Sequence, residues 1–126
     1  MLFKCKDGFV LREDKVYYIK LCEEGYALVY MSYDKETPYT INLEDYFSLA
    51  TSILKKNENF YITHNGDIFN VKNIMIMGFD NENNYYYAYI FDCKEESSDI
   101  FFVLTEEDYN KILEIYKKFY EWIKKL

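Results

Sequence analysis

Two segments of the chain have apolar residues at the 3.6-residue spacing of an amphipathic helix, and each follows segments with the two-residue alternation of strands. Before the first segment, Asn42 is a suitable N-cap, and acids occupy the first turn, where the helix dipole favours them. Before the second, Thr105 and the acids after it form a similar start. The sequence therefore predicts helices over residues 43–56 and about 106–125.

Short hairpin signals separate the strand-like segments. Asp7-Gly8, Glu23-Glu24-Gly25 and Asn65-Gly66 each stand between two alternating segments, and turns of this kind join antiparallel neighbours. Parallel strands would need much longer crossover connections. We therefore expect an α+β fold, a mostly antiparallel sheet of about six to eight short strands with the two amphipathic helices packed on it.

The length of the chain predicts one domain over residues 1–126. The two helix starts align at an offset of 63 residues, because the cap, a Glu-Asp-Tyr run and the next apolar residue coincide. The sequence thus admits two related halves, 1–57 and 58–126, each with a β-hairpin followed by a helix. The strands show no match at this offset, and two independently capped helices converge on the same pattern.

Acidic residues are concentrated in one part of the chain. Residues 80–108 hold nine acids and one lysine, a net charge of −8, whereas the whole chain carries −7. The same segment contains Tyr85, Tyr87 and Tyr89, which the two-residue period of a strand places on one face. Helix-start and turn positions account for the acids at both ends. The acids left over are Asp92, Glu95, Glu96 and Asp99. We predict that these four acids and the three tyrosines bind a partner.

The local negative field favours a basic partner. Binding to a nucleic-acid backbone needs Lys and Arg against phosphates, and the chain has a single arginine, Arg12. The prediction is therefore a basic protein, such as a nucleic-acid enzyme or a toxin, with no direct nucleic acid and no membrane. The competing interpretation is that the tyrosines are half-buried beneath a helix and the acids are only solvated.

Enzyme signals are weak. His64 is the only histidine, and its place before Asn65-Gly66 fits a strand end beside a turn. The cysteines Cys5, Cys22 and Cys93 form no CxxC pair, and with one histidine they do not provide a zinc site. The sequence also lacks a glycine-rich phosphate loop. We predict no catalytic residue, no metal site and no cofactor, and leave open a small enzyme or ligand-binding domain with an aromatic pocket.

The start of the chain carries charges where a signal peptide needs an apolar run. No apolar run approaches the roughly 20 residues that a membrane helix requires. With widely spaced cysteines that fit a reducing compartment, these features predict a cytoplasmic protein.

The helix expected over 106–125 has a broad apolar face with Ile115 and Trp122 at its edge. Tryptophan is enriched in interface hot spots, so this edge is a candidate homodimer contact. The alternative is a monomer in which the sheet covers it.

In its size, its acidity, its abundance of residues with AT-rich codons and its lack of motifs, the chain resembles phage and mobile-element inhibitors of the anti-CRISPR type. This resemblance implies a non-enzymatic inhibitory or neutralising module that sets an acidic-aromatic surface against a host defence enzyme that processes nucleic acid. It assigns no residue, because those inhibitors share no single fold. The alternatives are a toxin-immunity protein and a self-assembling structural module that dimerises through the C-terminal helix.

Overall fold

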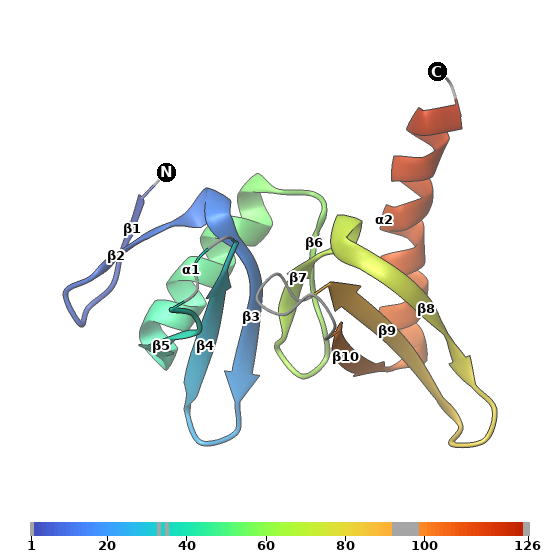
Figure 1. Ribbon diagram of the computed structural model, residues 1–126, viewed down its shortest axis with the longest axis horizontal. Coiled ribbons are helices and arrows are strands. Elements are labelled where there is room, and N and C mark those ends of the chain that lie inside the picture. Colours follow the sequence, from blue (N-terminus) through green and yellow to red (C-terminus); the bar gives the residue numbers. More distant parts are fainter. Residues whose placement is uncertain (1, 33, 35, 92–98, 125–126) are drawn as a thin grey trace. The chain divides into compact units, whose positions relative to one another are not determined.

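A computed structural model describes residues 2–32, 34, 36–91 and 99–124. The fold is α+β, as predicted, and within the described residues it has two α-helices and ten strands arranged in antiparallel sheets (Figure 1). The chain divides into two compact units, the N-terminal unit of residues 1–69 and the C-terminal unit of residues 70–126.

The N-terminal unit contains a two-stranded ribbon, a five-stranded sheet and one α-helix. The ribbon is β1 (Leu2–Lys4) and β2 (Val10–Arg12). The sheet consists of β3 (Val16–Cys22), β4 (Tyr26–Met31), β5 (Tyr39–Asn42), β6 (Phe60–Ile62) and β7 (Ile68–Asn70). Their order is β5-β4-β3-β7-β6, so β3 is central. A 3₁₀ turn, η1 (Glu13–Lys15), leads into β3, and a second, η2 (Val71–Asn73), follows β7.

The predicted hairpins are present. β1 pairs with β2 across Asp7-Gly8, and β3 pairs with β4 across Glu23-Glu24-Gly25. Gly25 has a φ of +98°, a conformation that residues with a Cβ rarely adopt. The Asn65-Gly66 turn joins β6 to β7, which lie side by side in the sheet.

Helix α1 (Leu43–Lys56) begins and ends as predicted. The Asn42 side-chain oxygen accepts a hydrogen bond from the Asp45 N–H at 2.8 Å, which satisfies one of the free donors of the first turn. The helix buries the face formed by Tyr46, Leu49, Ala50 and Ile53. That face packs against sheet residues Ile19, Ala27, Val29, Ile41 and Ile68, which together form the core of the unit.

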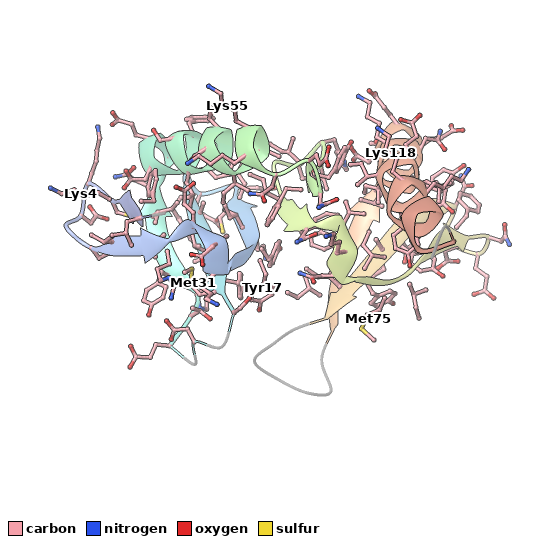
Figure 2. All side chains as sticks on the ribbon, turned by 90° about the horizontal axis from the view of Figure 1, so that it is seen from above. Lys4, Tyr17, Met31, Lys55, Met75 and Lys118 are labelled. Carbon is pink, nitrogen blue, oxygen red and sulfur yellow. The ribbon has the colours of Figure 1, made fainter. Side chains whose placement is uncertain are left out.

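The C-terminal unit is a three-stranded antiparallel sheet with one helix. Its strands are β8 (Ile74–Asp80), β9 (Tyr85–Phe91) and β10 (Asp99–Leu104), and the helix is α2 (Glu106–Lys124). β9 lies in the middle. Thr105 caps α2, because its hydroxyl accepts the Asp108 N–H at 3.0 Å. Lys55 and Lys118, which align at the 63-residue offset, are exposed residues of α1 and α2 (Figure 2).

The structure adds one strand that the sequence did not predict. Strand β5 was missed because it directly follows Pro38 and continues without a break into the cap of α1. Along the chain, the boundary between the compact units falls between Phe69 and Asn70, and the boundary of the predicted halves falls between residues 57 and 58. The single domain and the duplication both stay predictions. No helix in the described part of the chain is long and apolar enough to cross a membrane.

Candidate functional site

The turn between β6 and β7 is anchored to the core of the N-terminal unit. Within the turn, the Gly66 N–H donates to the Thr63 carbonyl at 2.9 Å, and the Thr63 N–H donates to the Asp67 carbonyl at 2.8 Å. From α1, the Tyr46 hydroxyl donates to the Gly66 carbonyl at 2.7 Å. Gly66 has a φ of +83°, and an added Cβ would lie 2.5 Å from Leu21 Cδ2. The turn therefore requires a glycine at this position for both conformation and space.

Asp67 fixes the turn from the other side. Its Oδ1 accepts the Leu21 N–H of β3 at 3.2 Å, and its own N–H donates to the Thr63 hydroxyl at 3.3 Å. Burial raises the pKa of the Asp67 carboxyl, while the Leu21 N–H and the nearby Lys20 and His64 act in the opposite direction. This carboxylate is part of the scaffold of the turn.

Two side chains at the tip of this turn, His64 and Asn65, are exposed. Asn65 and Asp67 line a hollow of about 510 Å³ together with Lys20, Glu23 and Glu24 from the β3–β4 hairpin. The turns of both hairpins point toward the same end of the unit (Figure 1). We call Lys20, His64 and Asn65 the tip site. It presents an amide, an imidazole and an ammonium group on a rigid support.

A second surface, in the C-terminal unit, contains the predicted tyrosines. The register places Tyr89 between Phe101 and Ile76, and Tyr87 between Val103 and Gly78. Tyr85, Tyr87 and Tyr89 therefore share one face of the sheet, as expected from the strand period. We call Tyr85, Tyr87, Tyr89, Phe101, Ile76 and Val103 the aromatic face. The alternate residues Tyr86, Ala88 and Ile90 lie on the face that carries α2, where Tyr86 packs against Tyr109 with ring centroids 4.7 Å apart.

The other predicted partner-binding residues lie beyond the part of the chain that the structure describes in full. Asp92, Glu95 and Glu96 lie outside the described residues, and the side chain of Asp99, the first residue of β10, does too. Ile115 is half-buried on α2, and Trp122 lies in the same helix with a side chain outside the described part. Binding at these positions and dimerisation through α2 stay predictions.

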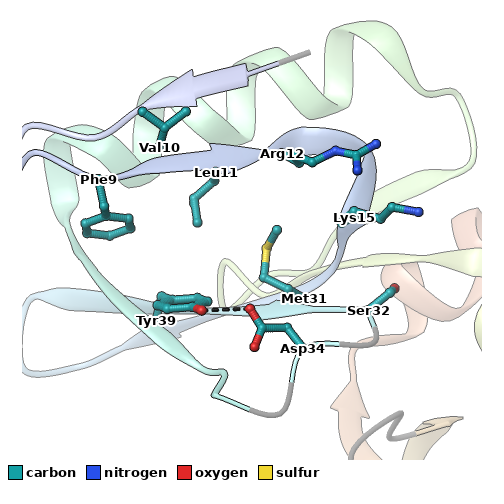
Figure 3. A pocket seen from close by; sticks show the side chains of 9 residues that line it. All are labelled: Phe9, Val10, Leu11, Arg12, Lys15, Met31, Ser32, Asp34 and Tyr39. Atoms are coloured by element: carbon teal, nitrogen blue, oxygen red, sulfur yellow. Dashed lines mark hydrogen bonds between the residues drawn. The ribbon is translucent and has the colours of Figure 1, made fainter.

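Another hollow of the N-terminal unit, of about 370 Å³, lies between β2 and the sheet. Figure 3 shows that Arg12 and Lys15 point away from it at one end. On another wall, the Tyr39 hydroxyl donates to Asp34 Oδ2 at 2.7 Å (Figure 3). The hollow thus presents mainly apolar side chains and one acid that already has a hydrogen-bond donor.

Chemistry that would indicate an enzyme is sparse in the described residues. Cys5 is buried, and burial together with the charges of Asp45 and Asp7 raises the pKa of its thiol to about 11. A thiol of this kind is protonated at neutral pH and is a poor nucleophile. Within the described part of the chain, no three His, Cys, Asp or Glu side chains lie close enough to hold a metal ion.

No protein family and no curated protein matches the sequence. Among solved structures, the fold is similar to the LytTr DNA-binding domain of a putative methyl-accepting/DNA response regulator from Bacillus cereus, with a TM-score of 0.52. The likeness covers 91% of this chain and 94% of that chain, at 13% sequence identity. At this identity the comparison shows a shared fold.

The shared fold corrects the predictions made from composition. The prediction of an inhibitory or neutralising module of the anti-CRISPR type is wrong, and so is that of a basic protein partner with no direct nucleic acid, because 91% of the chain folds like a domain named for DNA binding. Those predictions relied on charge summed over long segments. A nucleic-acid contact depends instead on a few side chains at one place, which a summed charge does not reveal.

The sequence did not predict the residues of the tip site as contact residues. The sequence placed His64 and Asn65 correctly beside a hairpin turn, but interpreted the histidine only as a strand end. The groups that anchor the turn, Tyr46 and the Leu21 N–H, are distant in sequence. The one local signal was an Asn-Gly pair with a polar residue on each side.

Proposed function

We propose that this chain is a DNA-binding domain that contacts duplex DNA through the tip site. The observation that carries the proposal is the likeness in fold, over nearly the whole length of both chains, to a LytTr DNA-binding domain. Because one fold can host several functions, the assignment of the contact surface rests on the geometry of this chain.

The tip site is suited to the edges of base pairs. The major groove admits narrow elements such as a two-stranded ribbon. The β6–β7 hairpin forms one edge of the five-stranded sheet, so its turn is the part that would enter the groove. An asparagine amide can bind adenine through its N6 and N7 positions, and the exposed Asn65 offers one. The bonds from Tyr46 and Leu21 hold the turn before DNA arrives, which lowers the entropy that binding costs.

Charge limits the contribution of the phosphates. The chain carries −7, and among the residues that the structure describes Lys20 is the only cation lining the hollow at the tip, where Glu23 and Glu24 also lie. Each phosphate that a cation neutralises steepens the salt dependence of binding by about 0.9 in the log–log slope. We therefore expect a shallow slope, about −1 to −3, with base contacts supplying much of the specificity.

The experiment starts from a randomised duplex library, since the target sequence is unknown. The full chain is used to enrich binding sites at low salt, and the affinity for the enriched duplex is measured by fluorescence anisotropy at fixed salt. Asn65→Ala should weaken binding by about 5- to 150-fold, since a bidentate base contact is worth ~1–3 kcal/mol. Asn81→Ala removes an exposed asparagine from another turn and should leave the affinity unchanged.

Two charge variants sharpen the same test. Glu23→Gln together with Glu24→Gln should tighten binding several-fold at low salt, because two carboxylates near the phosphates are removed. Lys20→Ala should reduce the magnitude of the salt slope by about 1. If no duplex is enriched, or if Asn81→Ala weakens binding as much as Asn65→Ala, the proposal is wrong.

We further propose that the chain acts by binding and without catalysis, and that it works in the cytoplasm. In support, the Cys5 thiol is protonated at neutral pH. Cys5 and Cys22 are both free thiols, which fits a reducing compartment.

A further inference from the structure

The aromatic face is an unusual surface for a small antiparallel sheet. Such a sheet usually turns one face to a helix and presents a polar face to water. Here the face without the helix exposes 58% of Ile76, 48% of Val103 and 41% of Phe101. An apolar surface that several strands build together usually has a binding role.

Its four rings form one connected group. Tyr85 and Tyr87 have centroids 6.5 Å apart and planes inclined by 64°, and Tyr87 and Tyr89 are 5.7 Å apart at 78°. From the neighbouring strand, Phe101 lies 6.0 Å from Tyr85 at 85° and 4.9 Å from Tyr89 at 50°. Steeply inclined rings allow more than one ring face to approach a single small group.

A hollow of about 620 Å³ lies along these rings and ends at the β8–β9 turn. Two acids of that turn, Asp80 and Glu82, line it, and no lysine or arginine of the described residues does. The Asp80 carboxylate is fixed, because Oδ1 accepts the N–H groups of Glu82 and Asn83 at 2.9 and 3.1 Å. The hollow therefore combines ring faces with a fixed negative charge at one end.

We propose that this hollow binds a small organic cation that carries a methylated ammonium group. Ring faces attract such a group through their quadrupoles, and its methyl groups bury well against them. The carboxylates of Asp80 and Glu82 complement its charge, whereas an anionic ligand would meet two like charges. A second copy of the chain is the less suitable occupant, because it would bring two more carboxylates to the same surface. The inference is independent of DNA binding.

The test compares choline with its neutral carbon isostere, 3,3-dimethylbutan-1-ol, on the full chain by ¹⁵N NMR titration. Choline should give saturable shifts at Tyr85, Tyr87, Tyr89 and Phe101. The affinity of the isostere should be lower by at least about 5-fold, since it has the same shape without the charge. Equal binding of both compounds, or shifts confined to other residues, would overturn the proposal.

Two variants separate the ligand site from the sheet that supports it. Glu82→Gln removes an exposed charge without touching the rings and should weaken choline binding by about 2- to 5-fold. Glu114→Gln removes an exposed charge on α2 and should leave it unchanged. Tyr89→Leu should abolish measurable choline binding. The amide resonances of α2 should keep their wild-type dispersion, which would show that the variant is still folded. Shifts that follow protein concentration in the absence of choline would identify a second copy as the occupant and contradict the proposal.

Discussion

The two units each contain a β-hairpin with an exposed tip, but the tips obtain their shape in opposite ways. Besides the bonds within it, the β6–β7 turn is held from outside, by a hydroxyl of α1 and a backbone N–H of β3. The β8–β9 turn is held from within, since the Asp80 side chain accepts N–H groups of its own turn and Asn84 adopts a φ of 58°. The first turn is therefore as rigid as the core beneath it, while the second is rigid by itself.

This difference matters for what each tip can do. A side chain that must meet a base edge needs a defined position relative to the whole unit, and the tip site has one. A turn that closes on itself needs only its own residues, and it places the carboxylates of Asp80 and Glu82 at the end of the aromatic hollow. The comparison predicts that distant substitutions disturb the first tip and that only local ones disturb the second.

The largest expected effect is that of an alanine at Gly66. The left-handed conformation costs ~1–2 kcal/mol for a residue with a Cβ, and the new Cβ would crowd Leu21 and Tyr46. Gly66→Ala should lower the free energy of unfolding by about 2–4 kcal/mol, measured by urea denaturation. Gly25→Ala is the matched control, because Gly25 has a φ of +98° but open space around it. It should cost only the conformational part, ~1–2 kcal/mol.

Equal losses in the two variants would mean that the β6–β7 turn is no better anchored than the β3–β4 turn. The two variants can also be compared in their affinity for the enriched duplex. Gly66→Ala should weaken binding under conditions where the chain is still folded, whereas Gly25→Ala should not.

The next effect compares the starts of the two helices. Asp45 and Asp108 occupy matching positions, and both are buried. The Asp45 carboxylate accepts the Lys6 N–H of the β1–β2 turn at 3.0 Å, whereas the Asp108 carboxylate accepts the N–H of Thr105 in its own cap, at 3.4 Å. Asp45→Ala leaves a part-buried donor of a different element without its acceptor and should cost ~1–3 kcal/mol. Asp108→Ala should cost less, ~0.5–1 kcal/mol, by the same urea measurement. An equal or reversed order would show that the link between the β1–β2 ribbon and α1 contributes little.

Much of the fold could be predicted from the sequence because its signals are local. The caps at Asn42 and Thr105 and the glycine turns act over a few residues, and the structure contains them where the patterns placed them. Strand β5 was missed because it has only four residues, directly after Pro38, and continues into the cap of α1. The boundary between the compact units has no local sequence signal either, since the segment around residues 69 and 70 is not rich in glycine or proline.

The sites were less predictable, for a physical reason in each case. The strand period correctly placed Tyr85, Tyr87 and Tyr89 on one face, but it could not determine which face α2 covers. The tip site depends on hydrogen bonds between residues 20 to 46 positions apart, and no sequence pattern encodes them. A charge sum counts every acid alike, although Asp108 within the acidic segment and Asp45 outside it are buried and accept backbone N–H groups, so the sum does not describe the surface of the chain.

The smallest expected effect is the pH dependence of stability that one carboxylate in each turn contributes. It should have opposite signs for Asp67 and Asp80. Burial raises the pKa of Asp67 above its ordinary value of 3.8, so the folded state holds the proton more tightly than the unfolded state. The stability that this group contributes is present below the ordinary pKa and is lost as pH rises through the raised one. Hydrogen bonds from Asn83 and Glu82 lower the pKa of Asp80, so its contribution is present above 3.8 and is lost as pH falls.

Asn substitutions isolate these two contributions, since an amide oxygen can still accept an N–H. Urea denaturation of the wild type and of each variant between about pH 3 and 7 gives the difference in unfolding free energy as a function of pH. Relative to the wild type, Asp67→Asn should gain stability as pH rises, whereas Asp80→Asn should lose it. Slopes of the same sign would mean that both carboxylates sit in equivalent surroundings, and the distinction between a turn anchored by the core and a turn closed on itself would fail.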